Sequence, residues 1–198
     1  MNMRQGKMKM LAKVLKIVCN IVFWITAVGF VLFLLASIFI SLIPGEHLVI
    51  PANMSGSLSA NFGGNMMFKF DPQTIGDIMI KPFLQALFMW ISVGALMVSV
   101  VIFEVKRILT AVIGDNPFKK ENSKNLTVIS LVLIAGSFIA PFMQGRIATA
   151  IIQTLKIDSI HFSYSMDGNL LFTGILILIL AGVFQYGNYL QEEVDSTL

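Results

Sequence analysis

The chain has 198 residues, of which 56% are apolar and only 13% are charged. A soluble domain usually carries about 25% charged residues, so this composition excludes an ordinary soluble domain. The net charge is +3, and we interpret the basic residues as membrane-topology signals and not as a nucleic-acid footprint. The single cysteine, Cys19, excludes an intrachain disulfide and does not make a metal site by itself.

Four long segments without Asp, Glu, Lys, Arg or His predict the fold: Ile17–Ile43, Phe83–Phe103, Leu126–Met143 and Leu170–Tyr186. About 20 apolar residues in a helix cross a bilayer core. In lipid a spanning segment must satisfy its own backbone, and these segments lack the alternation of barrel strands. The sequence therefore predicts an all-α membrane protein with four transmembrane helices, built as a single domain over residues 1–198.

The distribution of Lys and Arg predicts the orientation. The N-terminal tail and the middle loop, residues 104–125, hold ten of these residues, whereas the loops over residues 44–82 and 144–169 hold four. Cytoplasmic loops carry the excess of positive charge. We expect both termini and the middle loop in the cytoplasm and the other two loops outside.

The first outer loop has the composition of short strands. Ser57–Phe62 and Asn65–Phe70 flank Gly63-Gly64, which is typical of a hairpin. Asp71-Pro72 then resembles a helix start, so Gln73–Ile80 is expected to form a short interfacial helix.

The middle loop predicts a break between two helices. Residues Glu104–Ile113 continue the second span as helix into the cytoplasm. Gly114 suits a helix end, and Pro117 prevents continuation. Glu121, three residues before Lys124, fits the start of the next helix.

The second outer loop combines both patterns. Gln144–Ile157 has apolar residues at helical spacing, which predicts an amphipathic helix. Ile160–Ser165 alternates like a strand, and Met166–Gly168 forms a turn before the last span. Because isolated hairpins are marginal in water, we expect strands from both outer loops to form a small, partly β extracytoplasmic cap.

No catalytic, cofactor or metal site is predicted. His47 and His161 both fall on the outer side, but two histidines without assigned carboxylates fit surface residues better than a metal or pH-sensing pair. Ser-His-acid and phosphate-cradling spacings are missing, so we do not expect an enzyme. The spans lack the ionisable groups that a transporter usually needs.

Two stretches resemble a known family. One is Gly114–Phe118 followed by Glu121-Asn122, and the other runs from Gly174 to Asp195 through Val183–Gly187 and Leu190–Val194. Together they resemble the YoaS-like DUF family of bacterial four-span membrane proteins, often encoded beside an Xre-type helix-turn-helix regulator. The resemblance implies a multi-pass protein of the bacterial cytoplasmic membrane.

Both stretches are expected on the cytoplasmic side, where they are candidates for docking a partner. The candidate residues are Asp115, Asn116, Pro117, Phe118, Glu121, Asn122, Glu192, Glu193 and Asp195. Phe118 would provide an aromatic anchor, and the acidic tail would attract a basic partner. The alternative is structural, with a turn that locks two spans and a tail that neutralises basic residues.

The preferred function is therefore an integral membrane regulatory or sensory protein that binds a cytoplasmic partner, such as an Xre-type regulator, and does not contact nucleic acid directly. The alternatives are a small-solute transporter or channel, or a non-signalling immunity or structural membrane protein. The lipid bilayer is the expected surrounding, and self-association is left open.

Overall fold

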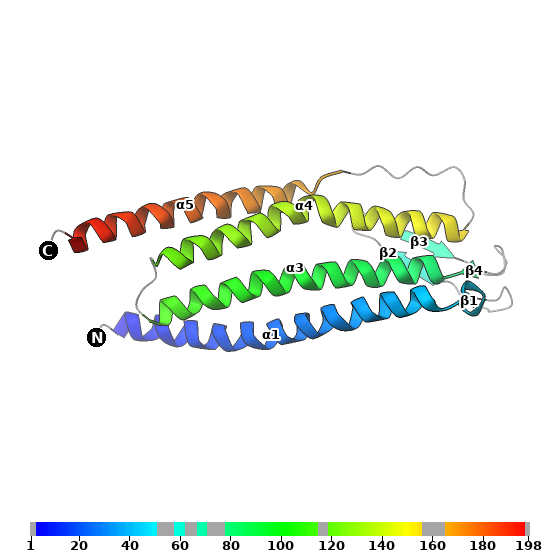
Figure 1. Cartoon of the computed structure of the whole chain (residues 1–198), viewed down its shortest axis with the longest axis horizontal. Helices are drawn as coiled ribbons and strands as arrows, with labels where there is room; N and C mark the ends of the chain where they lie inside the picture. The colour runs from blue at the N-terminus through cyan, green and yellow to red at the C-terminus, as the bar shows by residue number, and fades with distance from the viewer. Residues whose placement is uncertain are drawn as a thin grey trace. The chain divides into compact units, whose positions relative to one another are not determined.

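The computed structural model describes residues 3–50, 58–61, 67–70, 78–114, 119–155 and 165–196. Within these residues four long helices carry the fold: α1 (Met3–Leu42), α3 (Lys81–Ile113), α4 (Lys120–Leu155) and α5 (Gly168–Ser196) (Figure 1). All four are long and apolar enough to cross a membrane. The prediction of a multi-pass protein with four transmembrane helices is therefore confirmed.

The first outer loop contains short strands. A 3-10 turn at Gly45–His47 leads into β1 (Val49–Ile50), which pairs antiparallel with β4 (Ile78–Met79). The strands β2 (Leu58–Asn61) and β3 (Met67–Phe70) also pair antiparallel, with Leu58 opposite Phe70. Residues 78 and 79 are thus in a strand and not in the helix predicted for Gln73–Ile80, whose other residues, except Ile80, lie outside the described part. Residues 160–164 also lie outside it, so the cap shared by both loops stays a prediction.

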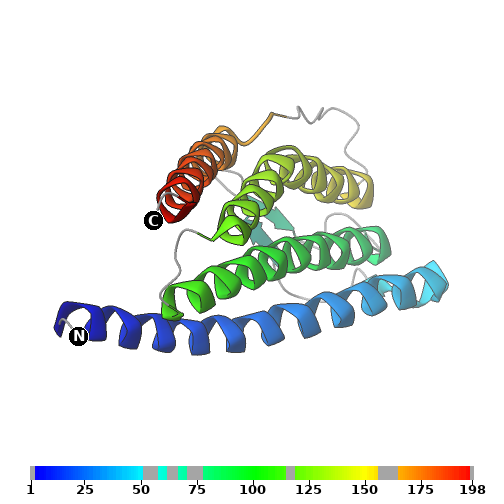
Figure 2. The same ribbon diagram turned by 60° about the vertical axis from the view of Figure 1, so that its left-hand side comes forward.

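The chain divides into two compact units. Unit 1 comprises Met1–Phe30, Gly94–Ile139 and Met166–Leu198, and unit 2 comprises Val31–Val93 and Ala140–Ser165. In unit 1 the first half of α1 runs beside the second half of α3, and the first half of α4 runs beside α5 (Figures 1 and 2).

In unit 2 a side chain at the start of α3 caps the C-terminal end of α1. The Lys81 ammonium donates hydrogen bonds to the carbonyl oxygens of Ser41 (3.0 Å) and Ile43 (2.6 Å). A cation near the last carbonyls of a helix satisfies acceptors that have no partner inside the helix. The buried apolar side chains of this unit gather on α4 and the end of α1: Ile40, Ile147, Ala148, Ala150 and Ile151.

In unit 1 a seam of small residues joins α4 to α5. On α4 it consists of three buried serines spaced seven residues apart: Ser123, Ser130 and Ser137. They face three residues with the same spacing, one just before α5 and two within it: Asp167, Gly174 and Ala181. The Ser123 hydroxyl donates to the Ala181 carbonyl at 2.8 Å. Small residues let membrane helices approach closely, and a spacing of seven residues places the contacts on one face of each helix.

Pro141 lies inside α4 without ending it. Proline has no N–H, so the carbonyl of Ser137, four residues earlier, loses its usual donor within the helix. The backbone N–H of Asp167 donates to that oxygen at 2.9 Å. Because α4 continues past Pro141 to Leu155, the segment Gln144–Ile157, predicted as a separate helix of the outer loop, is part of α4 as far as it is described.

Asp167 also starts α5. Its Oδ1 accepts hydrogen bonds from the backbone N–H groups of Asn169 (3.0 Å) and Leu170 (3.1 Å). A side-chain oxygen that accepts from the first free N–H groups is the usual helix N-cap. The turn predicted at Met166–Gly168 is thus the capped entrance of the last helix.

Candidate functional site

The predicted docking residues that the structure describes lie at two helix ends of unit 1. Glu121 and Asn122 occupy the first turn of α4, and Glu192 and Glu193 lie near the end of α5. Asp115, Asn116, Pro117 and Phe118 lie outside the described residues, and so does the side chain of Asp195.

Asn122 and Glu121 differ sharply in exposure. Asn122 is only 1% exposed, and its backbone N–H donates to the Lys119 carbonyl at 2.8 Å at the start of α4. Glu121 is exposed. The Asn122 side chain therefore belongs to the interior of unit 1, whereas the Glu121 carboxylate is available on its surface.

The end of α5 combines acidic and apolar surface. Glu192 and Glu193 are exposed, and Glu192 accepts a hydrogen bond from the Asn188 amide at 2.9 Å. Four large side chains on the same turns are exposed: Tyr186 (64%), Tyr189 (60%), Leu190 (43%) and Val194 (57%). Tyrosines favour the membrane–water interface, so contact with lipid accounts for the exposure of the two tyrosines. Leu190 and Val194 lie beyond the apolar segment that ends at Tyr186.

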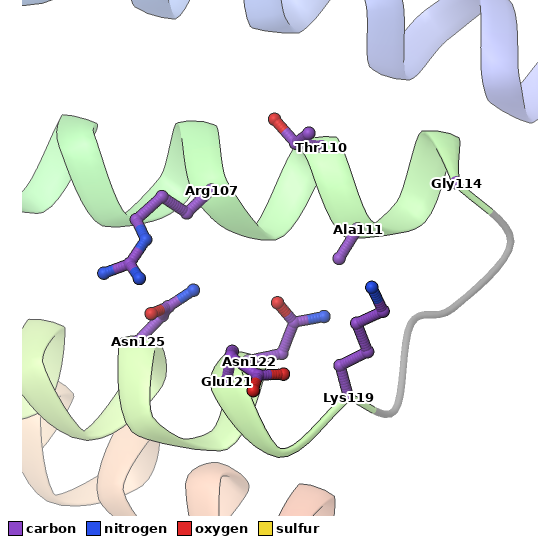
Figure 3. A pocket seen from close by; sticks show the side chains of 8 residues that line it. All are labelled: Arg107, Thr110, Ala111, Gly114, Lys119, Glu121, Asn122 and Asn125. Carbon is purple, nitrogen blue, oxygen red and sulfur yellow. The ribbon is translucent and has the colours of Figure 1, made fainter.

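A pocket of about 360 Å³, here called the inner pocket, separates the last turns of α3 from the first turns of α4 (Figure 3). It is lined by Arg107, Thr110, Ala111, Gly114, Lys119, Glu121, Asn122 and Asn125. Figure 3 shows the Arg107 guanidinium and the Asn125 amide extending toward each other from opposite walls. The inner pocket therefore has polar groups on both helices.

Glu104 is a buried acid beside the inner pocket. It is 7% exposed, and its Oε2 lies 3.3 Å from Nη1 of Arg107, one helical turn later. Arg107 is half-exposed, and its guanidinium carbon lies 5.8 Å from the Phe103 ring centroid. The helix at this position was predicted from the sequence, but the burial of Glu104 was not. The three-residue spacing of Glu104 and Arg107 was the available signal.

A second cation of the same helix is held against α1. The Lys106 ammonium donates to the Asn20 side-chain oxygen at 2.8 Å and lies 5.5 Å from the Phe23 ring centroid. Phe23 in turn contacts Phe103, with ring centroids 5.8 Å apart. Lys106 and Arg107 therefore point to different neighbours, and only Arg107 lines the inner pocket.

A smaller pocket of about 250 Å³ lies between α4 and α5. It is lined by Lys120, Ser123, Lys124, Thr127, Gln185, Asn188, Tyr189 and Glu192. The basic start of α4 and the acidic end of α5, which the sequence analysis placed together, thus share one surface of unit 1.

The described residues do not test whether the two histidines pair. His47 is exposed in the turn before β1, and His161 lies outside the described part. Within the part of the chain that is described, no three His, Cys, Asp or Glu side chains are placed to hold a metal ion.

Comparison with known proteins gives one match. The model of a family described as "Protein of unknown function (DUF2975)" matches residues 45–198, a range that includes α3, α4, α5 and both pockets. No curated protein and no solved structure matches the chain.

Proposed function

The chain belongs to the DUF2975 family, and from the surface of unit 1 we propose a membrane-anchored regulatory protein that binds a basic cytoplasmic partner. The observation that supports it best is the end of α5, where two exposed carboxylates stand beside exposed Leu190 and Val194. Apolar side chains flanked by charge are typical of interfaces, in which a few buried anchors supply most of the affinity.

The proposal places both termini and the connection between α3 and α4 in the cytoplasm. Ten Lys and Arg residues in these segments, against four in the two other loops, support that orientation. The start of α4 and the end of α5 then form the cytoplasmic face.

We expect cysteine labelling to report this orientation. In a Cys19→Ser background, His47→Cys should react with an impermeant maleimide added to intact cells, whereas Ser196→Cys should react only after the membrane is opened. Both positions are exposed in the structure. Labelling of Ser196→Cys in intact cells would reverse the orientation and remove the basis for a cytoplasmic partner.

The proposed partner is a helix-turn-helix transcription regulator. The resemblance to YoaS-like proteins, whose genes often neighbour an Xre-type regulator, supports this choice. Charge supports it too, since a DNA-binding protein is basic and is attracted to Glu192 and Glu193. The outer, partly β cap would receive the signal that alters this binding. The proposal includes neither catalysis nor a cofactor.

Substitution of the α5 surface should release the partner. The triple change Leu190→Ala, Glu192→Gln and Glu193→Gln removes one apolar anchor and two charges, so we expect retention of the regulator to fall about tenfold or more. The measurement is co-purification of a co-expressed Xre-type regulator with detergent-solubilised protein at low and high salt. Transcription from the regulator's promoter should change in parallel.

The matched control is Leu178→Ala combined with Glu46→Gln, which changes an exposed leucine of α5 within its apolar segment and an exposed acid of unit 2. It should retain the partner. Unchanged retention in the triple variant, with the wild-type protein binding the regulator, would show that the partner docks elsewhere. Failure of wild-type protein to bind it under any condition would reject the proposed function.

A further inference from the structure

We propose that the inner pocket binds a phosphate group, carried by an anionic phospholipid or by a free phosphate in the aqueous phase. This site goes beyond partner docking and does not depend on it, because the docking surface lies on α5 and the inner pocket lies between α3 and α4.

The Asn125 amide supplies donors on the α4 wall of the inner pocket. Asn125 is 3% exposed and lines the inner pocket. Within the described residues its side-chain amide forms no hydrogen bond, and its polar atoms remain accessible to the pocket. In Figure 3 the amide points into the space between the helices. A ligand in that space would satisfy its two N–H donors.

Arg107 supplies donors on the α3 wall of the inner pocket. The Glu104 carboxylate lies 3.3 Å from Nη1 of Arg107, and the Phe103 ring also contacts the guanidinium. A guanidinium has five N–H donors in a planar fork, so this contact leaves donors directed at the pocket. The fork matches phosphate oxygens, and charge-assisted hydrogen bonds of this kind are roughly twice as strong as neutral ones.

Shape favours phosphate over a carboxylate. The lining contains two cations, Arg107 and Lys119, and one acid, Glu121, and the buried Glu104 carboxylate pairs with Arg107, so directed N–H donors and not net charge would hold the anion. Donors from opposite walls approach a ligand from different directions, which suits a tetrahedral anion better than a planar one. Basic pockets between helices at the membrane surface are also the places where lipid headgroups bind.

The test measures phosphate binding to the full-length protein. One arm adds inorganic phosphate to protein in neutral detergent, against sodium chloride of equal ionic strength, and follows the unfolding temperature. The other arm compares nanodiscs of phosphatidylcholine alone with nanodiscs that also contain phosphatidic acid, and counts bound lipid by native mass spectrometry.

Two variants change the pocket without touching Arg107, whose contact with Glu104 supports the fold. Asn125→Leu keeps every charge and Lys119→Gln removes one, and each should lower phosphate affinity about tenfold. The controls are Asn169→Leu and Lys13→Gln, the same changes at exposed positions outside the pocket.

Stabilisation by inorganic phosphate that both pocket variants weaken would support a free phosphate as the ligand. Selective retention of phosphatidic acid that both variants weaken would support a lipid headgroup. Binding in neither arm, or binding that the pocket variants leave unchanged, would overturn the proposal. The comparison of Lys119→Gln with Lys13→Gln excludes a general charge effect, and the comparison of Asn125→Leu with Asn169→Leu excludes a general effect of replacing asparagine by leucine.

Discussion

Replacing Gly174 by alanine should destabilise the protein by about 2 kcal/mol, because added atoms in a closely packed interface force side chains and backbone apart. A Cβ at this position would lie 2.7 Å from Cγ1 of Ile134, 3.1 Å from the Ile134 backbone nitrogen and 3.2 Å from the Ser130 carbonyl oxygen. The Ile134 side chain can rotate, but the two backbone atoms belong to α4 and cannot move without separating the helices.

The matched control is Gly182→Ala on the same helix, where a Cβ would meet nothing within 4 Å. Alanine is the better helix former by about 1 kcal/mol, so this change should be neutral or stabilising. The measurement is the free energy of unfolding in mixed micelles. Equal effects of the two substitutions would show that α4 and α5 are not in contact at Gly174.

Replacing Arg107 by glutamine should also destabilise the protein by about 2 kcal/mol, because it leaves the buried Glu104 carboxylate without its cation. Loss of one partner from a fully buried ion pair costs about 3–5 kcal/mol, and the half-exposed guanidinium reduces that figure. Glu104→Gln should cost less than about 1 kcal/mol, since it removes the buried charge and leaves Arg107 facing solvent.

The double variant Glu104→Gln with Arg107→Gln should therefore be more stable than Arg107→Gln alone. Arg146→Gln, an exposed arginine of unit 2, serves as the control for loss of a positive charge. Unfolding of the four variants in the same micelles completes a double-mutant cycle. Additive effects of the two single changes would show that Glu104 and Arg107 do not stabilise each other.

The helices were predictable because lipid imposes a simple condition on the sequence. Segments such as Phe83–Phe103 contain no charge over the length of a bilayer, and only helices satisfy their own backbone there. The prediction that Glu104–Ile113 extends the second span as helix is confirmed, since α3 ends at Ile113. The hairpin signal at Gly63-Gly64 likewise falls between two strands that pair.

The details that make a site depend on contacts between helices, and these leave weak traces in one sequence. Asn122 and Glu121 are neighbours in a polar stretch and both line the inner pocket, yet Asn122 is buried and Glu121 is exposed. Asn125 was not singled out, since an asparagine near a helix start usually lies in water. Its burial follows from the packing of α3 and α4, which the sequence does not state.

Pro141 lies inside α4, and its consequence reaches the next helix. An ordinary residue at this position would offer an N–H to the Ser137 carbonyl and compete with Asp167 for it. The proline removes that competitor and so reserves the oxygen for the entrance of α5. Helices of a membrane protein associate after they have inserted, and an acceptor left free in lipid favours the one register that fills it. By omitting a single donor, the chain specifies the position at which its last helix docks.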